Sequence, residues 1–374
     1  MKTFGIVSYN IYCNFTNYGS ALQSWALSQA VNRLGGNKYR SMLVDYCPQV
    51  LKDKDPLNPF KNMWDKDEQS RRLCEMTLPA IRENYKKFDR FYRECFLRTR
   101  GSYTAENFEM LPQAEGVDGF ICGSDTIFCI EEFGGFDDGY FANYPCMRRL
   151  PSVAYAASFG DANFDETTYA VLNERLQNFR AIGLREGRMV PYVKAHTQVP
   201  VSQVWDPTLI LPAEAYAPIT GKHQIEGDYL LLYTRRYNED MERYAEMLAR
   251  KNGWKVVEIS LRATNAEKGH IMRYDAGVEE FLSLVKHAKY MVTNSFHGII
   301  FSTQFKTPFT AFSREQCGNK IDELLTRMGV SSRRITRYQE QEMPPIDFEA
   351  VHARIAQGRN ASLAFLEKEL DLCL

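Results

Sequence analysis

The sequence predicts an α/β fold in which two open parallel units face each other across a cleft. Short apolar segments rich in β-branched residues alternate with helical segments, as in parallel sheets whose strands are joined by helices. The alternation occurs on both sides of a polar stretch near 212–227, and the length of 374 residues exceeds that of most single cores. We expect domains at 1–218 and 225–342, and a terminal helix at 345–374 that is a candidate to pack back on the first domain.

The first unit opens with a strand–helix–strand pattern. A strand is predicted at Phe4–Tyr9, a helix at Gly19–Leu34 and a second strand at Ser41–Tyr46, which together require a right-handed crossover. The alternation is then lost, and about 48–115 reads as a helical insertion with a long charged helix near Lys66–Arg93. The later strands of this unit are predicted at Gly119–Gly123, Val153–Ser158, Ala181–Leu184 and Val201–Val204.

The second unit repeats the pattern after the linker. Its predicted strands are Tyr229–Tyr233, Lys255–Ile259 and Tyr290–Thr293. Its predicted helices are Glu239–Lys251, Val278–His287, Ile299–Phe305, Ile321–Met328 and, near the end of the chain, Phe348–Leu370. Open parallel sheets bind ligands at the carboxyl ends of their strands, so we expect the binding site there.

The segment 290–309 carries the strongest functional signal. A buried strand is predicted to end at Thr293, and the polar turn Asn294–Gly298 passes directly into an apolar helix. Such a turn aims backbone N–H groups, the Ser295 hydroxyl and the His297 imidazole at one point, an arrangement that suits an anion. The sequence therefore predicts a site for a phosphorylated or carboxylated small molecule.

Composition limits the other partners. The chain is 44% hydrophobic and 25% charged, and its 46 Lys and Arg residues nearly balance its 47 Asp and Glu residues. No global field attracts nucleic acid, so we expect no nucleic-acid partner. No apolar run approaches the roughly 20 residues of a transmembrane helix. The nine scattered cysteines and six histidines show no metal-ligand spacing, so we expect a cytoplasmic protein without a metal site.

Six segments in a fixed order carry a family resemblance. They are NYGSALQ at 17–23, ICGSD at 121–125, YAASFG at 155–160, LRE at 184–186, DPTLIL at 206–211, and TNSFHGIIFS with a following PF at 293–309. The sequence from about Phe4 to Arg334 resembles the polysaccharide pyruvyl transferase family. Two positions depart from the family pattern: Thr126 follows GSD in place of glutamine, and Ser295 stands where well-studied relatives have arginine.

The resemblance implies a fold, a reaction and partners. It implies two Rossmann-like domains facing each other, as in the glycosyltransferase B architecture, with the acceptor on the N-terminal domain and the donor on the C-terminal domain. It implies that the enolpyruvyl carbons of phosphoenolpyruvate move onto sugar hydroxyls as a ketal, in surface polysaccharide biosynthesis. No cofactor is implied, and peripheral contact with a lipid-linked acceptor is compatible with it.

His297 is the first candidate for phosphate contact and proton transfer, and the alternative is a core histidine satisfied by a backbone carbonyl. Arg185 ends a predicted strand, and its planar guanidinium suits a carboxylate or phosphate. An ion pair with Glu186 or another acid is the alternative. The full set of donor-binding candidates is Arg185, Ser295, Gly298, Arg235, Arg236, Arg314 and Lys320.

Asp125 is the candidate base for an acceptor hydroxyl, and helix capping with Ser124 is the alternative. The acceptor-binding candidates are Asn17, Tyr18, Gly19, Ser124 and Ser158. Asn17 serves equally well as a helix cap. The aromatic loop 128–144 is a candidate sugar platform, although a cluster that anchors the loop explains it as well.

Two other functions fit the same pattern. One is a glycosyltransferase that uses a nucleotide sugar on the same two-domain frame. The other is a non-catalytic protein that binds a sugar or an anion. Stabilisation by a nucleoside diphosphate, or ligand binding without turnover, would distinguish them from pyruvyl transfer.

Overall fold

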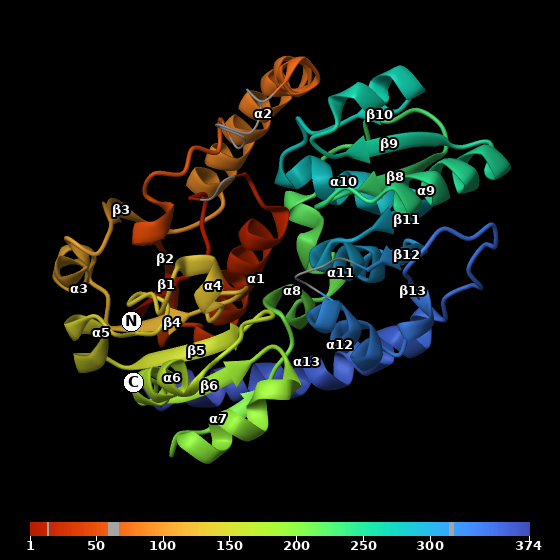
Figure 1. Cartoon of the computed structure of the whole chain (residues 1–374). Coiled ribbons are helices and arrows are strands. Elements are labelled where there is room, and N and C mark those ends of the chain that lie inside the picture. The colour runs from red at the N-terminus through yellow and green to blue at the C-terminus, as the bar shows by residue number, and fades with distance from the viewer. Residues whose placement is uncertain (13–14, 59–66, 314–317) are drawn as a thin grey trace.

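The computed structural model describes residues 1–12, 15–58, 67–313 and 318–374. Within these residues the strands form two parallel sheets, which lie in separate halves of the molecule (Figure 1). One has seven strands in the order β3-β2-β1-β4-β5-β6-β7, and the other has six in the order β10-β9-β8-β11-β12-β13. The predicted α/β class with two parallel sheets is confirmed. The elements around the first sheet are called the N-terminal domain and those around the second the C-terminal domain.

The N-terminal domain contains the first seven strands. They are β1 Lys2–Val7, β2 Tyr39–Tyr46, β3 Arg98–Tyr103, β4 Gly119–Cys122, β5 Ser152–Ala157, β6 Ala181–Leu184 and β7 Val201–Gln203. Its helices are α1 Tyr18–Gly35, α2 Glu68–Glu94, α3 Leu111–Glu115, α4 Ile130–Phe133, α5 Pro145–Arg149, α6 Glu166–Leu176, α7 Val190–His196 and α8 Pro207–Ile210.

The C-terminal domain contains the other six strands. They are β8 Tyr229–Tyr233, β9 Lys255–Ile259, β10 Ile271–Met272, β11 Tyr290–Thr293, β12 Phe309–Phe312 and β13 Arg334–Ile335. Its helices are α9 Glu239–Asn252, α10 Val278–His287, α11 Phe296–Gln304, α12 Gly318–Met328 and the terminal α13 Phe348–Asp371. Short 3-10 helices lie at Gln49–Leu51, Phe108–Met110, Gly187–Met189, Ala213–Ile219, Ala263–Lys268 and Ser331–Arg333.

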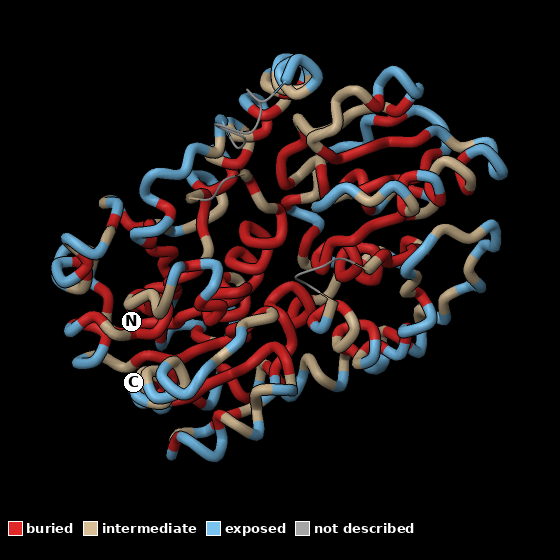
Figure 2. Tube along the Cα trace, in the orientation of Figure 1, coloured by how far each residue is buried: buried red, intermediate tan, exposed pale blue. Residues whose placement is uncertain are grey.

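The central strands are buried along their whole length, as in β5 and β8. Parallel sheets covered on both faces require continuous apolar runs rather than alternation, which is why these strands could be located in the sequence. Figure 2 shows that buried residues also fill α1 and α11 between the sheets. The core therefore continues through the boundary between the domains.

The predicted insertion at 48–115 is corrected in part. Residues Arg98–Tyr103 form β3, which pairs with β2 through Leu43 and Arg98 and extends the sheet. Helix α2 is therefore the crossover of an ordinary strand–helix–strand unit. The sequence concealed this strand because β3 is an edge strand that carries arginines, and only Thr99 and Tyr103 of it are buried.

Each sheet has one point at which the strand order reverses. It reverses between β1 and β4 in the first sheet and between β8 and β11 in the second. Crevices form at the carboxyl ends of such strands. The two crevices meet where the beginning of α1 faces the beginning of α11, because Gly19 of α1 packs against the His297 ring of α11.

The C-terminal helix α13 returns to the N-terminal domain, as predicted, and runs beneath its sheet in Figure 1. The Ser362 hydroxyl accepts a hydrogen bond from the Trp205 backbone N–H at 2.9 Å, and Lys38 pairs with Asp371 at 2.7 Å. None of the helices in the described ranges combines the length and the apolar character that crossing a bilayer requires.

Candidate functional site

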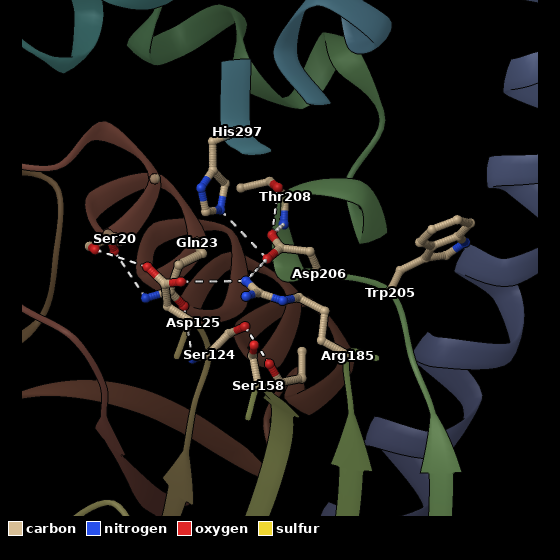
Figure 3. A network of polar contacts seen from close by, with 12 residues as sticks. Ser20, Gln23, Ser124, Asp125, Ser158, Arg185, Trp205, Asp206, Thr208 and His297 are labelled. Carbon is tan, nitrogen blue, oxygen red and sulfur yellow. Dashed lines mark hydrogen bonds and ion pairs between the residues drawn. The ribbon is translucent and has the colours of Figure 1, made fainter. Parts of the chain in front are cut away.

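A buried cluster of charged side chains lies where the two domains meet (Figure 3). His297 reaches in from α11 of the C-terminal domain, opposite Asp125, Arg185 and Asp206. Its Nε2 lies 3.5 Å from Asp206 Oδ2. Arg185 Nη1 lies 3.1 Å from the same oxygen and 3.5 Å from Asp125 Oδ1. One histidine, one arginine and two carboxylates therefore converge within contact distance.

His297 is positioned by the start of α11. The helix begins at Phe296, three residues earlier than predicted, because the Ser295 hydroxyl caps it by accepting a hydrogen bond from Gly298 N–H at 3.2 Å. His297 thus lies in the first helical turn, and only 6% of its surface is exposed. A Cβ added at Gly19 would lie 2.0 Å from His297 Nδ1, so this close approach requires glycine.

Arg185 follows β6 and adopts the ion pair that the sequence offered as the alternative. Its Nε donates to Glu186 Oε1 at 3.0 Å, and its guanidinium carbon lies 4.5 Å from the centre of the Phe296 ring. Burial disfavours the charge, but Glu186, Asp125 and Asp206 together raise the pKa of Arg185. Arg185 Nη2 is buried and has no hydrogen-bond partner among the described residues, and the same holds for His297 Nε2.

Asp206 was missed as a functional candidate. Its Oδ1 accepts hydrogen bonds from Thr208 N–H at 3.0 Å and from the Thr208 hydroxyl at 2.6 Å, which caps α8. From the sequence, Asp206-Pro207-Thr208 was expected only to fix a loop, and no local signal indicated that Oδ2 faces His297. Burial opposes ionisation of Asp206, yet His297 and Arg185 hold its pKa well below the ordinary value.

Asp125 does not cap a helix. Its backbone is left-handed, with φ of 72°, and its Oδ2 accepts a hydrogen bond from the Ser20 hydroxyl at 3.1 Å. Burial opposes ionisation, but Arg185, His297 and Lys320 lower its pKa. The carboxylate therefore stays ionised inside the cluster, and the proposed capping partner Ser124 instead donates to a backbone carbonyl.

Lys320 brings a second cation to the cluster. It lies in the first turn of α12, only 8% of its surface is exposed, and within the described ranges it forms no hydrogen bond or ion pair at contact distance. A small pocket lies beside it. The pocket is lined by Arg185, Glu186, Trp205, Asp206, Phe296, Lys320, Glu323, Leu324 and Arg327.

Several predicted acceptor contacts instead support the fold. Asn17 caps α1 by accepting a hydrogen bond from Gly19 N–H at 3.0 Å. The Tyr18 ring stacks on Phe281 of the C-terminal domain at 4.3 Å, and its hydroxyl donates to the Ala276 carbonyl at 2.7 Å. This buried placement does not favour sugar contact by Tyr18.

Ser158 and the aromatic loop also have structural partners. The Ser158 hydroxyl donates to Glu186 Oε1 at 2.6 Å and so helps to hold the partner of Arg185. The aromatic side chains of the loop are mostly buried, as in the Phe128–Phe141 stack at 4.4 Å. The loop-anchoring alternative therefore describes this segment better than an open sugar platform.

Arg235 and Arg236 lie outside the buried cluster. They follow β8, where the Asn294 side chain accepts from Arg235 N–H at 2.9 Å and donates to the Arg236 carbonyl at 2.6 Å. The Arg235 guanidinium carbon lies 5.1 Å from the centre of the Phe15 ring. Arg314 lies outside the described residues.

Solved structures of sugar-nucleotide enzymes resemble the whole chain. A proposed UDP-N-acetylglucosamine 2-epimerase from Listeria monocytogenes shares 10% identity, covers 99% of this chain and 96% of its own, and gives a TM-score of 0.52. The UDP-GlcNAc 2-epimerase of Methanocaldococcus jannaschii shares 13% identity, with coverages of 95% and 92% and a TM-score of 0.49. The E. coli ADP-heptose heptosyltransferase II shares 10%, with coverages of 98% and 100% and a TM-score of 0.39.

The likeness to the Listeria structure supports the two-domain, glycosyltransferase B-like fold. A comparison with curated proteins found no match. Residues 17–316, which cover most of the chain and include the Asp125, Arg185, Asp206 and His297 cluster, match a protein family. The chain is therefore an enzyme that belongs to the polysaccharide pyruvyl transferase family.

Proposed function

We propose that the enzyme transfers the pyruvyl group of phosphoenolpyruvate to two hydroxyls of a sugar in a surface polysaccharide precursor, forming a ketal. The observation that carries the proposal is that Arg185 Nη2 is buried without a hydrogen-bond partner and that His297 Nε2 has only the Asp206 carboxylate, at 3.5 Å, with Lys320 close to the same cluster. Buried donors without partners are costly unless a ligand satisfies them. A donor with a carboxylate and a phosphate supplies the acceptors that these groups lack.

The net charge of the cluster favours binding of an anionic donor together with a proton on His297. Arg185 and Lys320 bring two positive charges, whereas Asp125, Glu186 and Asp206 bring three negative ones. An anionic donor is therefore bound more favourably when His297 carries a positive charge, and the Asp206 carboxylate lies 3.5 Å from its Nε2. Protonated His297 is also the acid that the reaction needs.

The reaction requires two proton transfers from the acceptor. The central carbon of the donor gains two C–O bonds to the sugar, and it loses its double bond and its bond to phosphate. Of the two hydroxyl protons, one ends on the methylene carbon, which becomes a methyl group, and the other ends on the departing phosphate. We assign His297 to protonation of the methylene carbon and Asp125 to acceptance of the first hydroxyl proton.

The cellular setting is part of the same proposal. Cys47, Cys122 and the other described cysteines are free thiols, which fits the reducing cytoplasm. No cofactor is needed for the balanced reaction, and a lipid-linked acceptor would be reached by peripheral contact with a membrane.

Phosphate release from phosphoenolpyruvate tests the proposal. The purified enzyme is incubated with phosphoenolpyruvate and a panel of nitrophenyl glycosides and UDP-sugars, beside the His297→Ala and Arg185→Gln variants. We expect release that depends on one acceptor, with a loss of at least about 100-fold in either variant. No release above the variants with any acceptor, together with thermal stabilisation by UDP but not by phosphoenolpyruvate, would instead favour nucleotide-sugar glycosyl transfer.

A further inference from the structure

A second carboxylate lies at the N-terminal crevice, beside Asp125. Glu132 of α4 accepts a hydrogen bond on Oε2 from the Thr126 hydroxyl at 2.7 Å and from the Tyr9 hydroxyl at 3.4 Å. Tyr9 follows β1, and Thr126 follows Asp125 after β4. Glu132 is therefore hydrogen-bonded to the loops after β1 and β4, the two strands between which the sheet order reverses. Its other oxygen, Oε1, has no hydrogen-bond partner among the described residues.

Glu132 is reached by solvent and is also influenced by the protein around it. Its surface is exposed to solvent, and yet desolvation by the surrounding protein raises its pKa. Lys320 of α12 lowers the same pKa and Asp125 raises it, so all three groups act on one region of the crevice.

An aromatic face accompanies the carboxylate. The Tyr9 ring is half-buried and packs on Phe133 at 5.3 Å and on the buried Tyr140 at 6.4 Å. This packing fixes the ring beside Glu132. An aromatic face next to a carboxylate offers an apolar surface to the C–H groups of a sugar ring and hydrogen-bond acceptors to its hydroxyls.

The stoichiometry of ketal formation leaves a role for such a residue. Two hydroxyls lose protons, and Asp125 accounts for only one of them. We infer, on the basis of the proposed function, that Glu132 and Tyr9 bind the acceptor sugar and that Glu132 Oε1 accepts the proton of its second hydroxyl. That proton then passes to the departing phosphate, while the oxygen forms the second C–O bond to the central carbon of the donor.

Matched glutamine substitutions test the inference. Glu132→Gln keeps the shape and removes the negative charge and the basicity. Glu131→Gln is the control, because Glu131 lies on the same short helix and accepts from Asn163 N–H at 2.7 Å instead. Steady-state phosphate release is measured with the acceptor found active in the panel, as kcat and as KM for each substrate. Glu132→Gln should raise the acceptor KM or lower kcat by roughly 10- to 100-fold and leave the phosphoenolpyruvate KM within about 2-fold.

The pH profile separates proton acceptance from simple positioning. In the wild type, kcat/KM for the acceptor should fall as the pH drops through the raised pKa of Glu132, since only the ionised carboxylate is a base. Glu132→Gln should lose this limb, and Glu131→Gln should keep it. An unchanged acid limb in Glu132→Gln, or equal effects of the two variants on the acceptor KM, would overturn the inference.

A binding measurement keeps the inference testable if no acceptor supports phosphate release. Saturation-transfer NMR is recorded with methyl glycosides of galactose, glucose and mannose, for the wild type, Glu132→Gln and Tyr9→Leu. Sugar signals in the wild type that both variants lose would support this site even if pyruvyl transfer had failed. Equal signals in all three proteins, or no sugar binding at all, would refute it.

Discussion

The close approach of Gly19 to His297 gives the sharpest prediction. In Gly19→Ala the new Cβ would lie 2.0 Å from Nδ1, 2.5 Å from Cε1 and 2.6 Å from Cγ of the imidazole. Non-bonded carbon and nitrogen atoms need roughly 3.4 Å, so α1 and α11 must separate by about 1.4 Å, or the imidazole must turn away from Asp206. A displacement of about 1 Å in a reacting group costs on the order of 100-fold in rate.

The stability of Gly19→Ala should change much less. Overpacking costs about 1–3 kcal/mol, but alanine offsets roughly 1 kcal/mol of that through its higher helix propensity. We therefore expect about a 100-fold loss of kcat/KM for phosphate release with a small shift in the thermal unfolding midpoint. Gly318→Ala, which also lies at the start of a helix, is the control, because its nearest atom would be Arg334 Nη2 at 3.7 Å. Activity of Gly19→Ala within a few-fold of the control would refute the argued contact.

Three further substitutions have expected outcomes. Asp206→Asn leaves Arg185 and His297 with one buried counter-charge fewer, and should lower the urea unfolding free energy by about 3–5 kcal/mol; a loss below about 1 kcal/mol would show that the cluster rearranges freely. Burial raises the pKa of the Asp137 carboxyl to about 6, so the protonated form is favoured by folding. The free energy of unfolding is therefore higher by roughly 3 kcal/mol below about pH 4, and this contribution is lost as the pH rises through 6. Asp137→Asn should remove this slope from unfolding curves measured between pH 4 and 7, and an unchanged slope would contradict it. Lys320→Gln should weaken phosphoenolpyruvate binding in calorimetry by roughly 10-fold or more, and unchanged affinity would remove Lys320 from the donor site.

Much of the fold could be predicted because parallel strands buried on both faces are apolar throughout. The strands at Ala181–Leu184, Tyr229–Tyr233 and Tyr290–Thr293 have the predicted bounds for this reason. The edge strand Arg98–Tyr103 escaped prediction, because an edge with one buried face needs only a few apolar residues. The start of α11 was placed too late, since the capping role of Ser295 was not recognised.

Site residues could be predicted from the sequence only where the residue type and its position after a strand indicated a binding role. His297 and Arg185 follow strand ends, and that position alone indicated the crevice. The contact between Asp206 and His297 joins residues 91 positions apart, and only the packing of α8 beside α11 creates it. The ion pairs of Arg185 with Asp125 and Asp206 likewise form only in the folded sheet. The three residues follow β6, β4 and β7, and the sequence alone does not show that these strand ends lie side by side.

The return of α13 gives the chain two crossings between its halves. The main chain passes from the first half to the second after α8, and it passes back before α13 docks against Trp205 and Lys38. Two covalent connections restrict the sliding and twisting of the halves more than one connection would, and the core shared by both halves adds to this restraint. The spacing between His297 and Asp206, which lie on opposite sides of the boundary, is therefore set by the covalent path as well as by local packing.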